Sequence, residues 1–231
     1  MNALATDISE NSLSIRISLI IATYNRADCL LRTLNSAAEQ SLNPALYEII
    51  VVNNNSTDHT AETCQKFAES HANLHFHMVT EMRQGLSHAR NCGLTHATGE
   101  FFAIIDDDEL INHDFLKSYY DFFLTHPTVA ACGGIVTPLY EFTVPKWLNR
   151  YTERPIAGTL YFGEKIIPFP KGKYPGGGNM AIRRSAIEKY GAFDPNLGRT
   201  GTSPMGGEEK DMFARLRAAG EQIYYVPGAI I

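Results

Sequence analysis

Four consecutive acidic residues, Asp106 to Glu109, carry the strongest chemical signal in the sequence. They follow the apolar run Phe101 to Ile105, which has the length and composition of a buried strand. Four adjacent carboxylates repel one another at neutral pH, and a divalent cation is their natural counter-charge. Mg²⁺ usually takes one or two protein carboxylates and completes its shell with phosphates and water. The run therefore predicts a Mn²⁺ or Mg²⁺ site that a nucleotide-diphosphate substrate completes; a solvated acidic turn is the alternative.

The direction in which each acid points follows from the geometry of an extended segment, where neighbouring side chains alternate. We therefore expect Asp106 and Asp108 to share one side of the chain and Asp107 to point to the other. Different partners are expected on the two sides.

A second acidic signal, Glu208-Glu209, stands at the start of a predicted helix. The helix N-terminus favours the charged form of a carboxyl, whereas the neighbouring acids, including Asp211, favour the protonated form. A carboxylate in an enclosed cleft can act as a general base towards a hydroxyl group. The alternative is a charge that only complements the helix dipole.

The middle of the chain offers weaker candidates. The run Gly176-Gly177-Gly178 can cradle a phosphate or a sugar, and a plain loop fits it equally well. Trp147, the single tryptophan, can stack on a sugar ring or simply pack. It lies in the segment Thr137 to Pro175, which holds six of the eleven prolines and shows no helical period. Long irregular segments inside a domain are usually functional or mobile.

The elements that must position these residues alternate along the first half of the chain. Strand-like runs are expected at 15–21, 48–52, 74–79 and 101–105, with helical patterns after each of them, and a last strand at 222–226. This alternation favours an α/β fold with a parallel sheet and helices on both faces. Ligands of such sheets bind outside the carboxyl ends of the strands. Three polar clusters are expected there: Thr23 to Arg26, Asn53 to Asp58, and Asp106 to Glu109.

Composition excludes several classes of protein. The 231 residues are 44% hydrophobic and 19% charged, which fits one globular domain. The net charge of −5 argues against nucleic acid as a partner. No run approaches the ~20 apolar residues of a membrane span. Four scattered cysteines without a signal peptide indicate a reducing, cytoplasmic location. Neither a P-loop nor a GxGxxG motif follows the first strand, so ATP hydrolysis and hydride transfer have little support.

Taken together, the motifs resemble those of the family 2 glycosyltransferases, the GT-A-fold enzymes of bacterial polysaccharide biosynthesis. The matching segments are Ile20 to Arg26, Val51 to Asp58, Gly85 to Asn91, Asp106 to Asp108, Gly177 to Asn179 and Gly207 to Glu209. The resemblance runs from Ile17 to Val226 and implies a GT-A fold with a mostly parallel central sheet flanked by helices.

The resemblance also implies a domain organisation. Residues 1–14 form a loose lead-in and residues 15–231 a single GT-A domain, with a nucleotide-binding half (15–126) and a donor-sugar and acceptor half (127–231). The chain ends without a terminal helix, so truncation at the C-terminus is one of the expectations.

Site roles follow from the same resemblance. It implies nucleotide binding for eight residues: Thr23, Asn25, Arg26, Asn53, Asn55, Arg90, Asp106 and Asp107. It implies metal binding for Asp108 together with Asp106. Contacts with the donor sugar or acceptor are implied for Gly177, Gly178, Asn179 and Trp147. Glu209 matches the catalytic base of inverting members.

Two departures from the family pattern leave alternatives open. Asn53 stands where the family usually has an aspartate that contacts the base, and an amide both donates and accepts hydrogen bonds. The preference for uracil is therefore open. Glu209 replaces an aspartate and is one methylene longer, so Glu208 is the alternative base.

The function implied is an inverting, metal-dependent glycosyltransferase. It moves a sugar from a nucleotide-diphosphate donor, with a UDP-sugar favoured, to a hydroxyl of a glycan or lipid-linked acceptor in cell-surface polysaccharide synthesis. Peripheral association with the inner face of a membrane is a further expectation. One alternative is a sugar-nucleotide nucleotidyltransferase, which needs a basic glycine-rich loop that Thr23 to Arg26 does not provide. The other is a non-catalytic nucleotide-sugar-binding module, which Asn53 and Glu209 keep open.

Overall fold

The computed structural model describes residues 14–231, except 142, 146, 150, 154–157 and 201–205. Apart from Ser14, the predicted lead-in lies outside the described residues. The strands are β1 (Ile17–Thr23), β2 (Tyr47–Asn53), β3 (His75–Thr80), β4 (Phe101–Asp106), β5 (Ala131–Ile135), β6 (Ile167–Pro168), β7 (Met180–Arg183) and β8 (Ile223–Ile230). The helices are α1 (Ala27–Ala38), the 3₁₀ turn η1 (Pro44–Leu46), α2 (Thr60–Ser70), α3 (Leu86–His96), α4 (Phe115–Thr125), α6 (Arg184–Tyr190) and α7 (Glu208–Ala218).

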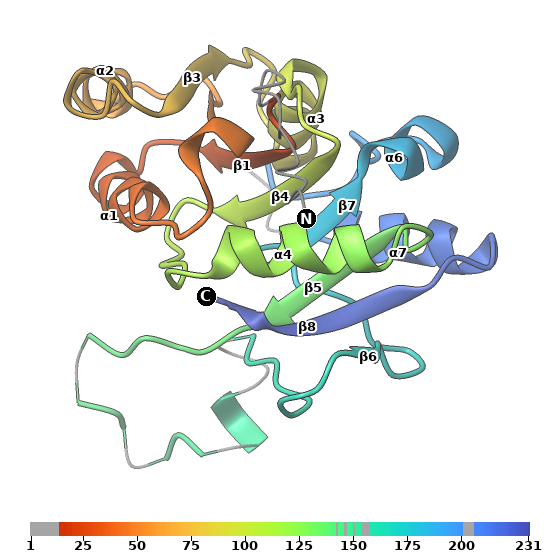
Figure 1. Ribbon diagram of the computed structural model, residues 1–231. Helices are drawn as coiled ribbons and strands as arrows, with labels where there is room; N and C mark the ends of the chain where they lie inside the picture. The colour runs from red at the N-terminus through yellow and green to blue at the C-terminus, as the bar shows by residue number, and fades with distance from the viewer. Residues whose placement is uncertain (1–13, 142, 146, 150, 154–157, 201–205) are drawn as a thin grey trace, which may run out of the picture.

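The strands form one sheet in the order β3-β2-β1-β4-β7-β5-β8-β6 (Figure 1). The first four strands pair in parallel, as do β5 and β8. By contrast, β7 is antiparallel to both β4 and β5, and β6 is antiparallel to β8. The prediction of a mostly parallel α/β sheet is therefore confirmed, and the antiparallel pairs lie in the second half of the chain.

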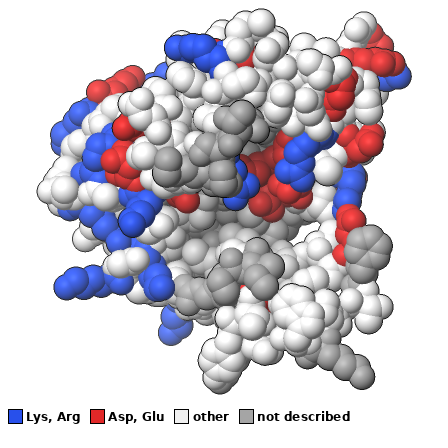
Figure 2. Space-filling model, turned by 180° about the vertical axis from the view of Figure 1, so that it is seen from behind, with Lys and Arg blue, Asp and Glu red and all other residues white. Residues whose placement is uncertain are grey.

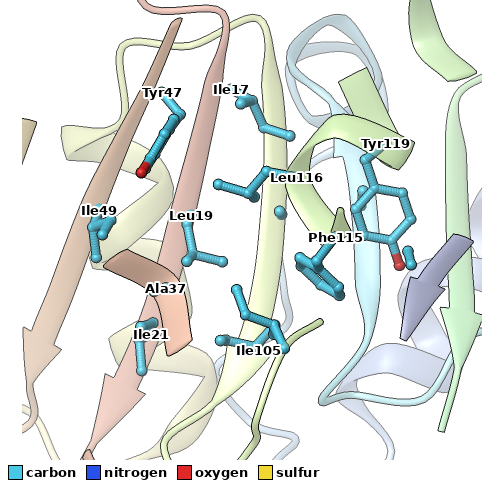
Figure 3. Close-up of a cluster of buried hydrophobic side chains, with 14 of the residues drawn as sticks. Ile17, Leu19, Ile21, Ala37, Tyr47, Ile49, Ile105, Phe115, Leu116 and Tyr119 are labelled. Atoms are coloured by element: carbon cyan, nitrogen blue, oxygen red, sulfur yellow. The ribbon is translucent and has the colours of Figure 1, made fainter. Parts of the chain in front are cut away.

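Helices cover both faces of the sheet, and each face has its own apolar core. One core joins the inward sides of α1, α2 and α4 to alternate residues of the strands, such as Leu19 and Ile49 (Figure 3). The other joins α3, α6 and α7 to the residues between them, such as Ile20 and Ile50. Because β1 and β2 are buried on both faces, they are apolar without alternation.

Three strands were not expected from the sequence. β5 contains Gly133-Gly134, and glycine weakens a strand pattern because it contributes no side chain to packing. β6 has two residues and β7 has four, which is too short for a clear period. The last strand was expected at 222–226 and continues to Ile230. Between β5 and β6 the chain runs out from the sheet (Figure 1), which matches the irregular segment that the sequence indicates.

Within the described part of the chain, no helix combines the length and the apolar character that crossing a membrane requires.

The pairing of β5 with β8 depends on Gly134. The register between these strands shifts between Gly133 and Ile135, and at this bulge a Cβ on Gly134 would lie 1.8 Å from the carbonyl oxygen of Ala229. That oxygen belongs to the backbone, so it can move away only if β8 moves with it. The tight contact fixes the position of the carboxyl end of β8.

We therefore expect Gly134→Ala to lower the free energy of unfolding by about 2 kcal/mol or more, which is within the range for forcing extra atoms into a packed interior. Gly176→Ala is the matched control, because nothing lies within 4 Å of its added Cβ. Urea denaturation followed by circular dichroism measures both variants. Equal stability of the two variants would contradict the contact.

Candidate active site

The carboxyl ends of β1, β2 and β4 meet at one edge of the sheet, as predicted. Thr23 pairs with Asn53, and Ala22 pairs with Asp106. A cavity of about 620 Å³ opens at this edge. It is lined by Ala22, Thr23, Tyr24, Arg26, Asn54, Gln84, Gly85, Leu86, Ala89, Asp106, Asp107, Asp108, Glu109, Gly158, Arg199 and Thr200. On the face drawn in Figure 2, a hollow near the centre holds acidic and basic side chains side by side.

The loop after β1 is tied to the loop after β2 through Asn25. Its backbone is left-handed, with φ of 54°, and its Oδ1 accepts hydrogen bonds from the backbone N–H of Thr57 at 2.7 Å and of Asp58 at 3.3 Å. In return, the Asn25 N–H donates to Ser56 Oγ at 3.0 Å. Asn25 does not line the cavity and in this structure holds the loops after β1 and β2 together, so its predicted contact with the nucleotide stays a prediction.

The run Asn53-Asn54-Asn55 distributes its roles differently from the prediction. The Oδ1 of Asn53 accepts from the Ser56 N–H at 2.8 Å, and Asn55 is an exposed, left-handed residue with φ of 59°. Asn54 is the one that lines the cavity. Its amide donates to the carbonyl oxygens of Glu81 and Arg83 and accepts from Gly85. Three identical residues in a row gave no signal that distinguished Asn54.

The four acids do not alternate as expected, because β4 ends at Asp106 and a turn follows. Asp107 is buried, accepts a hydrogen bond from Thr23 Oγ1 at 2.7 Å and pairs with Arg26 at 3.2 Å. Asp108 is 44% exposed and pairs with the other nitrogen of the Arg26 guanidinium at 2.8 Å. Arg26 therefore supplies part of the counter-charge that the sequence assigned to a cation, and Asp107 serves as an internal anchor.

Burial disfavours the charged form of two acids of this run, Asp107 and Glu109. It raises the pKa of Asp107 to about 6, although the Thr23 hydrogen bond and Arg26 act against the rise. Burial, with the charges of Asp106 and Asp108, raises the pKa of Glu109 to about 8. The neighbouring carboxylates thus disfavour a fourth negative charge, and a cation or hydrogen-bond donor that entered the cavity would relieve the repulsion.

Arg90 is the centre of a buried polar cluster. Its side chain is 1% exposed, and its guanidinium donates to Asp106 Oδ1 at 2.9 Å, to Glu208 Oε1 at 2.7 Å and to the carbonyl oxygen of Gly177 at 3.0 Å. The same guanidinium lies over the ring of Phe193. The family resemblance implied contact with the nucleotide, but Arg90 does not line the cavity. Its contacts make it a positioning residue in this structure, and its predicted contact with the nucleotide stays a prediction.

The two glutamates that open α7 differ in their surroundings. Glu208 is buried and holds Arg90 with one oxygen, while its second oxygen has no hydrogen-bond partner among the described residues. Glu209 is half-buried, and its pKa is raised by burial and then by the charge of Glu208. Neither lines the 620 Å³ cavity. Glu208 is thus bound to Arg90, and the assignment of Glu209 as the catalytic base stays a prediction.

The glycine run lies directly beside the acids. β7 is antiparallel to β4 and Met180 pairs with Ile104, so the residues before β7 continue along the acidic end of β4. A Cβ on Gly178 would lie 2.6 Å from Glu109 Oε1 and 3.4 Å from Asp106 Oδ2. A side chain at position 178 would therefore have to displace the Glu109 carboxyl.

Asn179 has a different environment from its predicted one. Its side chain is fully buried, accepts from the Tyr119 hydroxyl and donates to the carbonyl oxygens of Ile135 and Ala229. These hydrogen bonds connect the segment before β7 to α4, β5 and β8, and the predicted contact of Asn179 with the sugar stays a prediction.

Trp147 lies between β5 and β6, in the part of the chain that runs out from the sheet. It is 62% exposed and does not line the cavity. Its assignment to the sugar or acceptor stays a prediction. Sequence reasoning assigned no role to several lining residues: Tyr24, Gln84, Glu109, Arg199 and Thr200. Only Glu109, as the last acid of its run, carried a signal that could have identified it.

The residues at the cavity suit a hard divalent cation in part. Oxygen donors of Asp106 and Asp108 have the chemistry that Mg²⁺ and Mn²⁺ prefer. Among the described residues, however, no three acidic, histidine or cysteine side chains are arranged to hold a metal by themselves. The donor set therefore fits a cation whose remaining ligands come from a substrate.

The Arg90 cluster gives the first prediction for this site. Arg90→Met leaves two carboxylates unpaired, and breaking a buried ion pair typically costs about 3–5 kcal/mol. We expect the free energy of unfolding, measured by urea denaturation, to fall by about 3 kcal/mol or more. Arg32→Met is the control, because its pair with Glu141 is exposed and such pairs contribute about 0–1 kcal/mol. Similar losses in both variants would contradict the cluster's importance.

The raised pKa values of Glu109 and Asp107 predict how stability depends on pH. Between about pH 4 and 8 the folded protein retains protons on these two carboxyls that the unfolded chain has already released. The favourable contribution of the two groups to the free energy of unfolding is therefore complete below about pH 4 and is lost as the pH rises through about 8. The free energy of unfolding without metal should therefore fall between about pH 5 and 8. Glu109→Gln should flatten this fall, and an unchanged slope would contradict the assignment. Denaturation midpoints at several pH values, with a chelator present, test it.

Comparison with known proteins places the chain in a family. Residues 18–191 match the family described as Glycosyl transferase family 2. The chain is 34% identical over 181 residues to the glycosyltransferase AglE of Haloferax volcanii, covering 78% of this chain and 57% of that protein. It is 27% identical over 219 residues to the succinoglycan biosynthesis protein ExoM of Rhizobium meliloti, covering 94% and 66%. The chain thus spans less than two thirds of the length of these relatives.

Solved structures share the fold. A mannosyltransferase of Pyrobaculum calidifontis, in complex with GDP-Man and Mn²⁺, superposes with a TM-score of 0.69 at 22% identity, covering 94% of this chain and 57% of that one. TarS of Staphylococcus aureus, in complex with UDP-GlcNAc, gives 0.71 at 19% identity, covering 94% and 58%. Because the family match extends over residues 18–191, most of the chain, this chain belongs to glycosyl transferase family 2.

Proposed function

We propose that this chain is the catalytic part of an inverting, metal-dependent glycosyltransferase, which moves a sugar from a nucleotide-diphosphate donor to a hydroxyl of an acceptor. The observation that carries the proposal is the Arg90 cluster. It joins Asp106, at the acidic end of β4, to Glu208, which precedes the candidate base Glu209. We infer that Arg90 thereby holds two parts of the site, the acids that face the diphosphate and the general base, at a fixed separation.

The nucleoside end of the donor is assigned to the loops after β1 and β2. Thr23, Arg26 and Asn54 line the cavity there, and Asn25 and Asn53 hold the loops in shape. The N-terminus of α3 also opens into the cavity at Gly85, with no acidic residue in its first turn. Such a helix end favours an anion, which agrees with a phosphate nearby.

The diphosphate is assigned to the acids of β4. Asp108 and Asp106 are the residues that would hold a divalent cation together with the donor's phosphates. When bound, such a cation offsets the negative charge that develops on the leaving diphosphate. Arg26, which pairs with Asp107 and Asp108, is close enough to this region to contact the phosphates as well.

Glu209 is assigned as the general base that removes the proton from the acceptor hydroxyl. Burial and the adjacent Glu208 raise its pKa, which makes its carboxylate a stronger base than an ordinary glutamate. The deprotonated oxygen attacks the anomeric carbon from the face opposite to the diphosphate, so the configuration is inverted. Glu208 keeps Arg90 in place and thereby positions both Asp106 and the start of α7.

The names of relatives guide the choice of substrates. ExoM is named for succinoglycan biosynthesis, and another relative, 25% identical, is a glucosyl-dolichyl phosphate glucuronosyltransferase of Haloferax volcanii. We therefore propose a glycan or lipid-linked acceptor in cell-surface polysaccharide synthesis, used on the cytoplasmic side at the inner face of the membrane. A UDP-sugar is the favoured donor, with GDP-sugars as the first alternative.

Calorimetric titration of UDP, GDP, CDP and ADP, each with Mn²⁺ and with a chelator, tests donor binding. One diphosphate should bind in a metal-dependent manner, and Asp108→Asn should weaken that binding about tenfold or more, since loss of a metal's supporting groups commonly has effects of this size. His75→Asn, on the exposed strand β3, is the control. The absence of any diphosphate binding by folded protein would contradict the proposed function.

The base assignment has its own test, the rate at which the bound nucleotide sugar releases its diphosphate. Glu209→Gln should leave donor affinity nearly unchanged and lower this rate by about 100-fold or more, the usual effect of a lost general base. Glu208→Gln should instead lower stability, because it weakens the pair with Arg90. Unchanged turnover in Glu209→Gln would show that Glu209 is not the base.

A further inference from the structure

Glu109 is the acid of the β4 run that the proposed mechanism leaves without a role. The other three have partners: Asp106 binds Arg90, and both Asp107 and Asp108 bind Arg26. For the Glu109 carboxyl, the described part of the chain provides no hydrogen bond and no ion pair. It nevertheless lines the cavity and is only partly exposed. A carboxyl in such a place loses hydration without compensation, which a ligand would supply.

The Glu109 carboxyl, from a residue that lines the cavity, lies directly against the glycine at position 178. A Cβ at this position would lie 2.6 Å from Glu109 Oε1, so the carboxyl occupies the space that any other residue would fill. The adjacent Gly177 is fixed by its carbonyl oxygen, which accepts from Arg90 at 3.0 Å. Glu109 therefore lies between the acids of β4 and a glycine segment that is itself held by the Arg90 cluster.

The order of the strands indicates which part of the donor reaches this place. Along the edge of the sheet, the neighbours are β2, β1, β4 and β7. The loops after β2 and β1 take the nucleoside, and the acids after β4 take the diphosphate. The next position along this line is the segment just before β7, where Gly178 lies beside Glu109. The group attached to the far phosphate, which is the transferred sugar, must extend in this direction.

We propose that Glu109 is a specificity-determining residue, whose carboxyl group forms hydrogen bonds with the hydroxyls of the transferred sugar. This inference rests on the proposed function and extends it to the sugar end of the site. A carboxyl group has two oxygens and can bond to two adjacent hydroxyls at once, and these bonds are charge-assisted and stronger when the group is ionised. Glu109 thus selects sugars with free hydroxyls on the side that faces Gly178.

The test compares two ligands that differ only in the sugar. UDP and UDP-GlcNAc, and GDP and GDP-mannose, are titrated with Mn²⁺ into wild-type protein and into Glu109→Gln, by calorimetry. The affinity for the free diphosphate should change by less than about twofold, whereas the affinity for the nucleotide sugar should fall about tenfold, as expected for loss of a hydrogen bond to a charged group. Glu188→Gln, exposed on α6, is the matched control and should change neither.

Other outcomes would overturn the inference. An equal loss for diphosphate and nucleotide sugar would make Glu109 a ligand of the metal or the phosphates. Unchanged affinity for both would leave it without a role in the donor site. If folded wild-type protein binds none of the four ligands, the proposed function fails first, which is a distinct result from selective failure of Glu109→Gln.

A second pair of variants tests the same contact from Gly178. Gly178→Ala places a methyl group where the Glu109 carboxyl lies, so it should displace that carboxyl and weaken binding of the nucleotide sugar. In a Glu109→Ala background the same substitution should cost less, because the displaced group is already absent. Equal losses in the two backgrounds would contradict the proposed position of Glu109.

Discussion

The buried guanidinium of Arg90 is the interaction on which the rest of the site depends. Asp106 lies in the middle of the chain and Glu208 near its C-terminus, yet both bind this one side chain. A buried arginine is costly to desolvate, and only well-oriented partners offset that cost. With Asp106, Glu208 and the Gly177 carbonyl in place, the guanidinium fixes the end of β4, the start of α7 and the segment before β7 relative to one another.

This arrangement explains why the sheet changes direction where it does. The parallel half brings the carboxyl ends of β1, β2 and β4 together, which is the usual place for a ligand in an α/β sheet. The antiparallel strand β7 then brings an amino end to the same edge, so that Gly177 and Gly178 lie beside the acids. One edge of the sheet thereby combines the proposed nucleotide site with a second wall built from the later part of the chain.

Much of this could be predicted from the sequence because its signals are local. Buried strands such as β1 and β4 are uninterrupted apolar runs, and the acids follow one of them directly. The short strands β5 and β7 lack such a signal, because glycines and few residues leave no period. The burial of Arg90 and Asn179 could not be predicted either, since their partners come from distant parts of the chain that only the fold brings together.

The central claim is that the acidic end of β4 and the start of α7 form one donor site held together by Arg90. The most direct measurement is a crystal of this chain soaked with Mn²⁺ and the diphosphate that binds best, with the metal located by its anomalous scattering. The account predicts a single Mn²⁺ at about 2.1 Å from a carboxylate oxygen of Asp108, bridged to the phosphates, with Arg90 still bound to Asp106 and Glu208. A metal located elsewhere, or an Arg90 released from either carboxylate, would contradict it.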